Sequence, residues 1–198
     1  DAMAGRGPRA ITELVRADEA EPPAIVEFFQ ELNPVDTLAA MEALGRGEQA
    51  RLFELMASAR PLAVDDLLPE EPRRGETYIW EGVNSLPLFR RFQKRFALTE
   101  TAGELAGYND QALQWLVGPG YFVAHRSEGD DPPGDLVFDY TMTPAQRPPG
   151  WPKVVAADRG ISRFVYGHMQ DYMRRVTDDV MIGRAWKKGE ATGNYFIL

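Results

Sequence analysis

The sequence contains no cysteine, and this absence excludes disulfide bonds, thiolate nucleophiles, iron–sulfur clusters and most structural zinc sites. Histidine is scarce as well: His125 and His168 leave too few ligands for a typical transition-metal site. No run approaches the roughly 20 apolar residues that span a bilayer, and the first residues lack the apolar core of a secretory signal. We therefore expect a cytoplasmic protein with no metal, no cofactor and no membrane span.

Positive charge is also in short supply, with 22 Lys and Arg residues against 30 Asp and Glu residues and a net charge of −8. A protein that binds nucleic acid normally shows the opposite balance. The negative charge therefore disfavours polynucleotides and anionic membranes as partners. The length of 198 residues suits one domain, or one domain with a helical extension.

What is present changes character near residue 75. Before it, apolar residues recur at helical spacing in three stretches, AIVEFFQELN, NPVDTLAAMEALGRG and GEQARLFELMASA. After it, runs rich in aromatic and β-branched residues are typical of strands: TYIWEGV, GYFVAHR, DLVFDYTM, SRFVYGHM, DVMIGRAWK and NYFIL. The later links are short enough for hairpins, which favours antiparallel pairing.

The predicted fold class is therefore α+β, with N-terminal helices followed by a mostly antiparallel curved sheet or small barrel. The expected division is a helical segment at 1–75 and a β-rich domain of six to eight strands at 76–198. One or two covering helices interrupt the strands. The stretch NDQALQWLVG predicts one of them, with Leu113, Trp115 and Leu116 packed against the sheet.

The second covering helix is predicted over NSLPLFRRFQKRF, residues 84–96. At about 100° per residue, its apolar side chains fall on one arc and its basic side chains on the other. The apolar arc holds Leu88, Phe89, Phe92 and Phe96, and the basic arc holds Arg90, Arg91, Lys94 and Arg95. We expect the basic face to meet the chain's own carboxylates or an acidic protein partner.

Two stretches resemble known families. Within residues 24–58, the stretch FFQELNPVDTLAAMEALGRGEQARLFELM resembles one helical repeat of the cytoplasmic N-terminal domain of magnesium transporters. That resemblance implies helical architecture, and no magnesium-binding residues are carried over from it. The stretch DYMRRVTDDVMIGRAWKKGEATGNYFIL resembles the closing strands of lipocalin-like small-ligand barrels, although the glycine of the usual G-x-W motif is missing before Trp80. That resemblance implies a closed pocket for a small apolar molecule.

One candidate catalytic site involves His125 in GYFVAHR and Asp139 in LVFDYTM. An even register shift between these strands brings the two side chains into diagonal contact, whereas an odd shift places them on opposite faces. If they meet in a pocket, Asp139 orients His125 as a general base, with Tyr140 as a proton donor. The alternative is an ordinary hydrogen-bonded or solvated strand histidine.

Aromatic side chains are the richest feature of the sequence, and they suit either a ligand pocket or a core. Arg184 shares a strand face with Val180, Ile182 and Trp186, so it either points inward to an acidic group or lies at the surface. The candidate ligand-binding residues are Trp80, Tyr121, Tyr166, His168, Arg184 and Trp186.

Two functions remain open on these observations. The first is a small-ligand-binding or protein-interaction module whose partner is a small apolar or aromatic molecule, or a protein docked on the N-terminal helices or the basic face. The second is a metal-independent acid–base enzyme of isomerase, cyclase or dehydratase type that uses His125 and Asp139.

Overall fold

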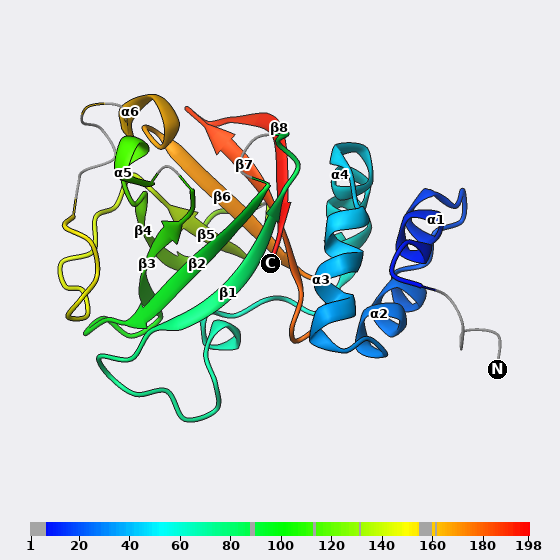
Figure 1. Ribbon diagram of the computed structural model, residues 1–198, viewed down its shortest axis with the longest axis horizontal. Coiled ribbons are helices and arrows are strands. Elements are labelled where there is room, and N and C mark those ends of the chain that lie inside the picture. Colours follow the sequence, from blue (N-terminus) through cyan, green and yellow to red (C-terminus); the bar gives the residue numbers. More distant parts are fainter. Residues whose placement is uncertain (1–6, 88–89, 113, 131, 155–159, 161) are drawn as a thin grey trace.

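Eight antiparallel strands close into one barrel in the computed structural model, where each strand pairs with the next and the last strand pairs with the first (Figure 1). The structure describes residues 7–87, 90–112, 114–130, 132–154, 160 and 162–198. The strands are β1 Tyr78–Asn84, β2 Arg91–Leu98, β3 Glu104–Asp110, β4 Tyr121–Arg126, β5 Leu136–Asp139, β6 Met169–Arg175, β7 Met181–Lys187 and β8 Glu190–Ile197.

Alternation of side chains across the barrel wall decides which residues face inward. Three inward-facing glycines sit directly opposite phenylalanines on the neighbouring strands, in the pairs Gly82–Phe92, Gly107–Phe122 and Gly183–Phe196. A Cβ atom at any of these glycines would come within 2.4 Å of the facing ring. The glycines therefore make room for rings that lie across the strands, and the interior becomes an aromatic core.

The two ends of the barrel are filled differently. At the end where β1 begins, the short 3-10 helix η2, Val64–Leu67, packs Val64 and Leu67 onto the interior apolar cluster together with Leu62. At the opposite end lie two short helices, α5 Gln114–Val117 and α6 Ser162–Val165 (Figure 1). The first end is thus plugged by the chain segment that precedes β1.

Four N-terminal helices lie to one side of the barrel, along the outer faces of β1, β7 and β8 (Figure 1). Pro22 stands at the start of its helix, and the Asn33 side chain caps the next one by accepting a hydrogen bond from the Asp36 amide. Helical and barrel residues share one buried cluster, in which Phe53 contacts Tyr195 edge-on at 6.0 Å. The helices are α1 Ala10–Arg16, α2 Pro22–Gln30, α3 Pro34–Ala43 and α4 Arg46–Leu55, followed by the 3-10 helix η1 Met56–Ser58.

This architecture confirms the predicted fold class of N-terminal helices followed by an antiparallel barrel. It also agrees with the barrel implied by the lipocalin-like resemblance. Within the described part of the chain, no helix combines the length and apolar character needed to cross a membrane.

The predicted helix over residues 84–96 is wrong, because Asn84 ends β1 and residues 91–98 form β2; Leu88 and Phe89 lie outside the described residues. The helical arc was a coincidence of spacing, since Phe92, Lys94 and Phe96 equally share one face at a period of two. Pairing with β1 and β3 satisfies the backbone of the strand on both sides.

Because the predicted helix does not form, these residues make no continuous basic face: Lys94 points into the barrel, while Arg91 and Arg95 point outward. Three of the four basic side chains nevertheless meet the chain's own carboxylates, whereas Arg90 donates to the Glu42 and Leu44 carbonyls. Arg91 contacts Glu42, Arg95 contacts Asp110 at 2.5 Å, and Lys94 lies 3.3 Å from Asp171.

Three smaller corrections concern the barrel mouth and its strands. The run SRFVYGHM is a helix at its start, since α6 covers Ser162–Val165 and β6 begins only at Met169. Strand β3 was not predicted. The helix α5 is a single turn in which the Trp115 side chain is 81% exposed, so it does not pack on the sheet; Leu116 is also exposed, and Leu113 lies outside the described residues.

Candidate functional site

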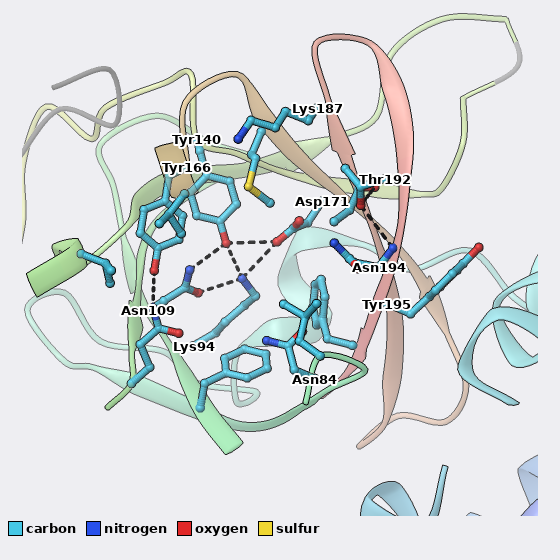
Figure 2. A pocket seen from close by; sticks show the side chains of 18 of the residues that line it. Asn84, Lys94, Asn109, Tyr140, Tyr166, Asp171, Lys187, Thr192, Asn194 and Tyr195 are labelled. Carbon is cyan, nitrogen blue, oxygen red and sulfur yellow. Dashed lines mark hydrogen bonds and ion pairs between the residues drawn. The ribbon is translucent and has the colours of Figure 1, made fainter. Parts of the chain in front are cut away.

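A cavity of about 330 Å³ occupies the barrel mouth, at the end that carries α5 and α6 (Figure 2). Its apolar lining is largely aromatic, whereas its polar lining is concentrated on a few inward-facing side chains. The aromatic residues are Phe92, Tyr140, Phe164, Tyr166, Tyr195 and Phe196, and the innermost polar residues are Lys94, Asn109 and Asp171.

The floor of the cavity is a closed hydrogen-bond network around Lys94 (Figure 2). The Lys94 Nζ donates to Asn109 Oδ1 at 2.9 Å, to the Tyr140 hydroxyl at 2.7 Å and to Asp171 Oδ2 at 3.3 Å. The Tyr140 hydroxyl in turn accepts a hydrogen bond from Asn109 Nδ2 at 2.9 Å and donates to Asp171 Oδ2 at 3.0 Å. All three donors of the ammonium group are therefore engaged.

Both charged members of this network are almost inaccessible, with side chains 2% and 5% exposed for Lys94 and Asp171. Five aromatic rings surround the ammonium, the nearest being Phe122 at 4.8 Å and Phe196 at 4.9 Å from Nζ to the ring centroid. Ring faces attract a cation that has lost its water. The arrangement holds an ion pair among the aromatic side chains of the barrel interior.

Burial sets the protonation behaviour of the network. Desolvation lowers the pKa of Lys94 to about 8, although the adjacent Asp171 carboxylate opposes the shift. Desolvation likewise raises the pKa of Asp171, against the effect of Lys94, and raises that of Tyr140 well above its ordinary value. Each shift disfavours the charged form, so the site holds its charges only because they are paired.

One oxygen of the network is left over. Asp171 Oδ1 is buried and has no hydrogen-bond partner among the residues that the structure describes. Asp171 pairs with Ala185 across β6 and β7, and the small Ala185 side chain also lines the cavity. Asp171 itself also lines the cavity, so the oxygen without a partner belongs to a residue of the cavity wall.

Nearer the opening, Tyr166 stacks on Tyr140 with centroids 5.2 Å apart and an interplanar angle of 12°. The Tyr166 hydroxyl accepts a hydrogen bond from Gln111 at 2.6 Å, and its ring lies over Gly120, where a Cβ would come within 2.4 Å. The Lys187 Nζ donates to the Phe164 carbonyl at 2.8 Å. These contacts fix a flat aromatic wall on one side of the cavity.

The structure brings two of the predicted site residues, Tyr140 and Tyr166, into this cavity. Trp80 lies toward the plugged end, where its Nε1 donates to the Leu67 carbonyl at 3.1 Å. Tyr121 faces outward and packs with Tyr108 and Trp151.

The remaining predicted ligand-binding residues lie apart from the cavity. His168 is an exposed turn residue with a φ of 60°. Arg184 and Trp186 share the outer face of β7 with Ile182, as their spacing predicted, and Arg184 lies 3.5 Å from Glu54 of α4.

His125 and Asp139 do come together, on the outer face of β4 and β5. The register pairs His125 with Val137, an even shift that leaves Asp139 diagonal to the histidine, with Nε2 and Oδ2 3.9 Å apart. The carboxylate raises the pKa of His125. Although burial opposes it, the nearby His125 and the hydrogen bonds from Thr141 and Gln170 lower the pKa of Asp139 to about 2.

Sequence reasoning missed Lys94, Asn109 and Asp171 as site residues. A usable signal was present in RFQKRF, where Phe92, Lys94 and Phe96 alternate with polar residues. A lysine in the apolar row of such a strand is unusual, because a buried lysine needs a partner. Its partner, Asp171, is 77 residues away, and no local pattern connects them.

The described part of the chain contains no group of three or more acidic or histidine side chains that could hold a metal ion. Comparisons with known protein families, with curated proteins and with solved structures give no match for this chain.

Proposed function

We propose that the protein binds a small apolar or aromatic molecule in the cavity at the barrel mouth. The observation that carries the proposal is a cavity of about 330 Å³ with an aromatic lining and a polar floor. Small-molecule sites typically enclose roughly 300–1,000 Å³ and combine apolar walls with a few placed polar groups.

The surroundings of the opening support the same function. Trp115, Leu116 and Phe164, on the two short helices at the mouth, are 81%, 44% and 72% exposed. Apolar side chains grouped at a pocket opening favour contact with an apolar ligand over contact with water alone. The polar floor then fixes one orientation of a ligand whose body is apolar.

The proposal is tested by filling the cavity. Ala185 lines it, so Ala185→Phe places a ring in the space that a ligand would occupy, while Ala191→Phe makes the same change at an exposed position of β8. We expect naphthalene-based ligands to bind the wild type and Ala191→Phe equally, and Ala185→Phe at least tenfold more weakly. Undiminished binding to a folded Ala185→Phe variant would contradict the proposal.

A second candidate is the acid–base enzyme that uses His125 and Asp139. The contact between their side chains and the raised pKa of His125 favour it, and Tyr140, on the opposite side of the wall, would then take no part. Exchange of α-protons of small carbonyl compounds in D₂O, followed by NMR, tests it. Exchange at the same rate in wild type and in His125→Gln would rule this function out.

A protein partner on the N-terminal helices is a third proposal. The helices already bury one face on the barrel, so a partner would meet their outward side. Crosslinking of the intact chain to a partner at exposed positions such as Val35, which is 78% exposed, tests this. A pattern of crosslinks confined to the barrel would contradict it.

A further inference from the structure

We infer that the molecule bound in this cavity is neutral, and that it donates a hydrogen bond from a hydroxyl or N–H group to Oδ1 of Asp171. The inference rests on the proposed function, because it specifies the class of ligand that the same cavity accepts. It rests on three features of the floor: a buried oxygen without a partner, the space beside it and the charge around it.

The first feature is the unequal use of the two Asp171 oxygens. Oδ2 accepts hydrogen bonds from Lys94 and Tyr140, whereas Oδ1 has no partner among the described residues. Asp171 is only 3% exposed, and buried carboxylate oxygens are normally hydrogen-bonded. A ligand that donates a hydrogen bond to such an acceptor gains binding free energy, because the acceptor has already lost its hydration in the free protein.

The second feature is space on the side of Asp171 away from Lys94. In Figure 2 the Asp171 carboxylate lies between the Lys94 network and the Thr192 and Asn194 side chains of β8. All of these residues line the cavity, as does the small side chain of Ala185 opposite Asp171. The proposed donor approaches Oδ1 from the space between Asp171 and β8, so it leaves the Lys94 hydrogen bonds undisturbed.

The third feature is the charge balance, which selects a neutral donor. A cationic ligand would add a second positive charge beside the Lys94 ammonium in a medium of low polarity. An anionic group beside Oδ1 would face the Asp171 carboxylate, and Lys94 has no free donor to offer it, because its three are already used. The other lysine of the lining, Lys187, lies at the opening, where its Nζ donates to the Phe164 carbonyl. A hydroxyl or N–H group satisfies the acceptor and leaves the ion pair neutral overall.

The shape of the lining selects the rest of the molecule. The stacked Tyr140 and Tyr166 rings form a flat wall, and Phe92 and Phe196, in edge contact at 5.8 Å, close the other side. Such walls favour a planar aromatic body. Phenols and indole-like compounds have both the flat body and the neutral donor.

The test uses four probes with the same ring system: 2-naphthol, 2-methoxynaphthalene, 2-naphthoate and protonated 2-(aminomethyl)naphthalene. Their dissociation constants are measured by calorimetry on the full chain at pH 7. We expect 2-naphthol to bind at least tenfold more tightly than the methoxy compound, which has the same body but no donor. The two charged probes should bind more weakly still.

A paired substitution isolates the contribution of Asp171. Lys94→Met with Asp171→Leu removes both charges together, which avoids leaving one of them buried alone. In this variant we expect 2-naphthol and 2-methoxynaphthalene to bind within threefold of one another. The matched control, Arg95→Met with Asp110→Leu, removes the outward-facing ion pair next to it and should keep the tenfold preference.

The outcomes separate the inference from the proposed function. Equal binding of 2-naphthol and 2-methoxynaphthalene by the wild type, or tighter binding of a charged probe, overturns the inference while the cavity remains a binding site. Absence of binding by all four probes contradicts the proposed function itself. If the paired variant does not fold, the comparison of probes on the wild type and on the control variant still decides.

Discussion

Two carboxylates on neighbouring strands of this barrel have pKa values that are shifted in opposite directions. Asp171 of β6 faces inward, where burial raises its pKa, whereas Asp139 of β5 faces outward and has a pKa of about 2 because hydrogen bonds outweigh burial. Each has a basic neighbour, Lys94 at 3.3 Å and His125 at 3.9 Å. The difference shows that the direction in which the pKa of the carboxylate shifts depends more on the face of the barrel wall than on the presence of a basic neighbour.

The same contrast occurs between adjacent residues of one strand. Lys94 is buried in the aromatic interior, while Arg95 lies on the outside with a side chain 29% exposed. The interior pair is shielded from water and salt, and the outer pair is screened by both. Substitutions on the two faces therefore test the comparison directly.

The largest expected effect comes from breaking the interior pair on one side only. Lys94→Met leaves the Asp171 carboxylate buried without a cation, and we expect a loss of about 3–5 kcal/mol in the free energy of unfolding. The double substitution with Asp171→Leu should lie within about 1–2 kcal/mol of the wild type. Urea denaturation at pH 7 measures both, and a double variant as unstable as the single one would contradict the pairing.

The next effect is a pH dependence above neutrality. The pKa of Lys94 is about 8 in the folded protein, below its ordinary value of 10.5, so between these values the unfolded chain binds a proton that the folded protein does not. Stability from this residue therefore rises with pH. Relative to the Lys94→Met, Asp171→Leu variant, we expect the wild type to gain on the order of 2 kcal/mol between pH 7.5 and 10.

That comparison is made by urea unfolding of both proteins at matched pH values, which cancels the titration of groups that do not interact with Lys94 or Asp171. A difference that stays constant or shrinks as the pH rises would show that Lys94 is not desolvated in solution.

A smaller effect, at acidic pH, is expected for the His125–Asp139 pair on the outer face of the barrel. Because the pKa of Asp139 is lowered to about 2, the stability that it contributes is present above about pH 4 and is lost as the pH falls through 2. We expect Asp139→Asn to reduce the free energy of unfolding by roughly 1–2 kcal/mol at pH 6, after a discount for partial exposure.

NMR titration of His125 provides the control for this substitution. The raised pKa of His125 should return toward 6.5 in Asp139→Asn, because the carboxylate that raises it is gone. The corresponding stabilisation is present below the unfolded value of about 6.5 and disappears as the pH rises through the folded pKa. An unchanged His125 pKa would show that the contact does not exist in solution.

The smallest effect is expected for Arg95→Gln. Its partner Asp110 and its own side chain are both about one-third exposed, and surface ion pairs contribute a median of about 0–1 kcal/mol. The free energy of unfolding should therefore change by less than about 1 kcal/mol. Thermal melts at low and high salt check this; a loss comparable to that of Lys94→Met would erase the distinction between the two faces.

The helical and strand periodicities were sufficient to predict helices followed by an antiparallel barrel, because both patterns are local. They also placed His125 and Asp139 within reach of each other under one register. The position of that pair could not be predicted, since GYFVAHR is apolar at almost every position and does not distinguish inside from outside. Only barrel closure, which pairs residues far apart in sequence, makes Phe122 an interior residue and His125 an exterior one.

The stretch at residues 84–96 shows why the central site escaped prediction. Its apolar residues satisfied a helical and a strand period at once, and the choice between them depended on hydrogen bonds to β1 and β3. Once the strand forms, Lys94 is carried inside, and its burial is tolerated only because Asp171 and Asn109 arrive from other strands. Residues far away in the sequence therefore determine that this lysine is buried, although the local sequence predicts that it lies on a basic surface.

The pairing of β1 with β8, which closes the barrel, has a consequence for how the chain folds. Strands β1 and β8 meet over just two residue pairs, Val83–Ile197 and Asn84–Phe196, which join the two extremes of the sheet in sequence. Contacts of such high separation form late, and α3 contacts β1 while α4 contacts β7 and β8. The N-terminal helices therefore contact both sides of the β1–β8 pairing, where the barrel wall has the fewest paired residues. We expect the amide hydrogens of these β1 and β8 residues to become protected last during refolding.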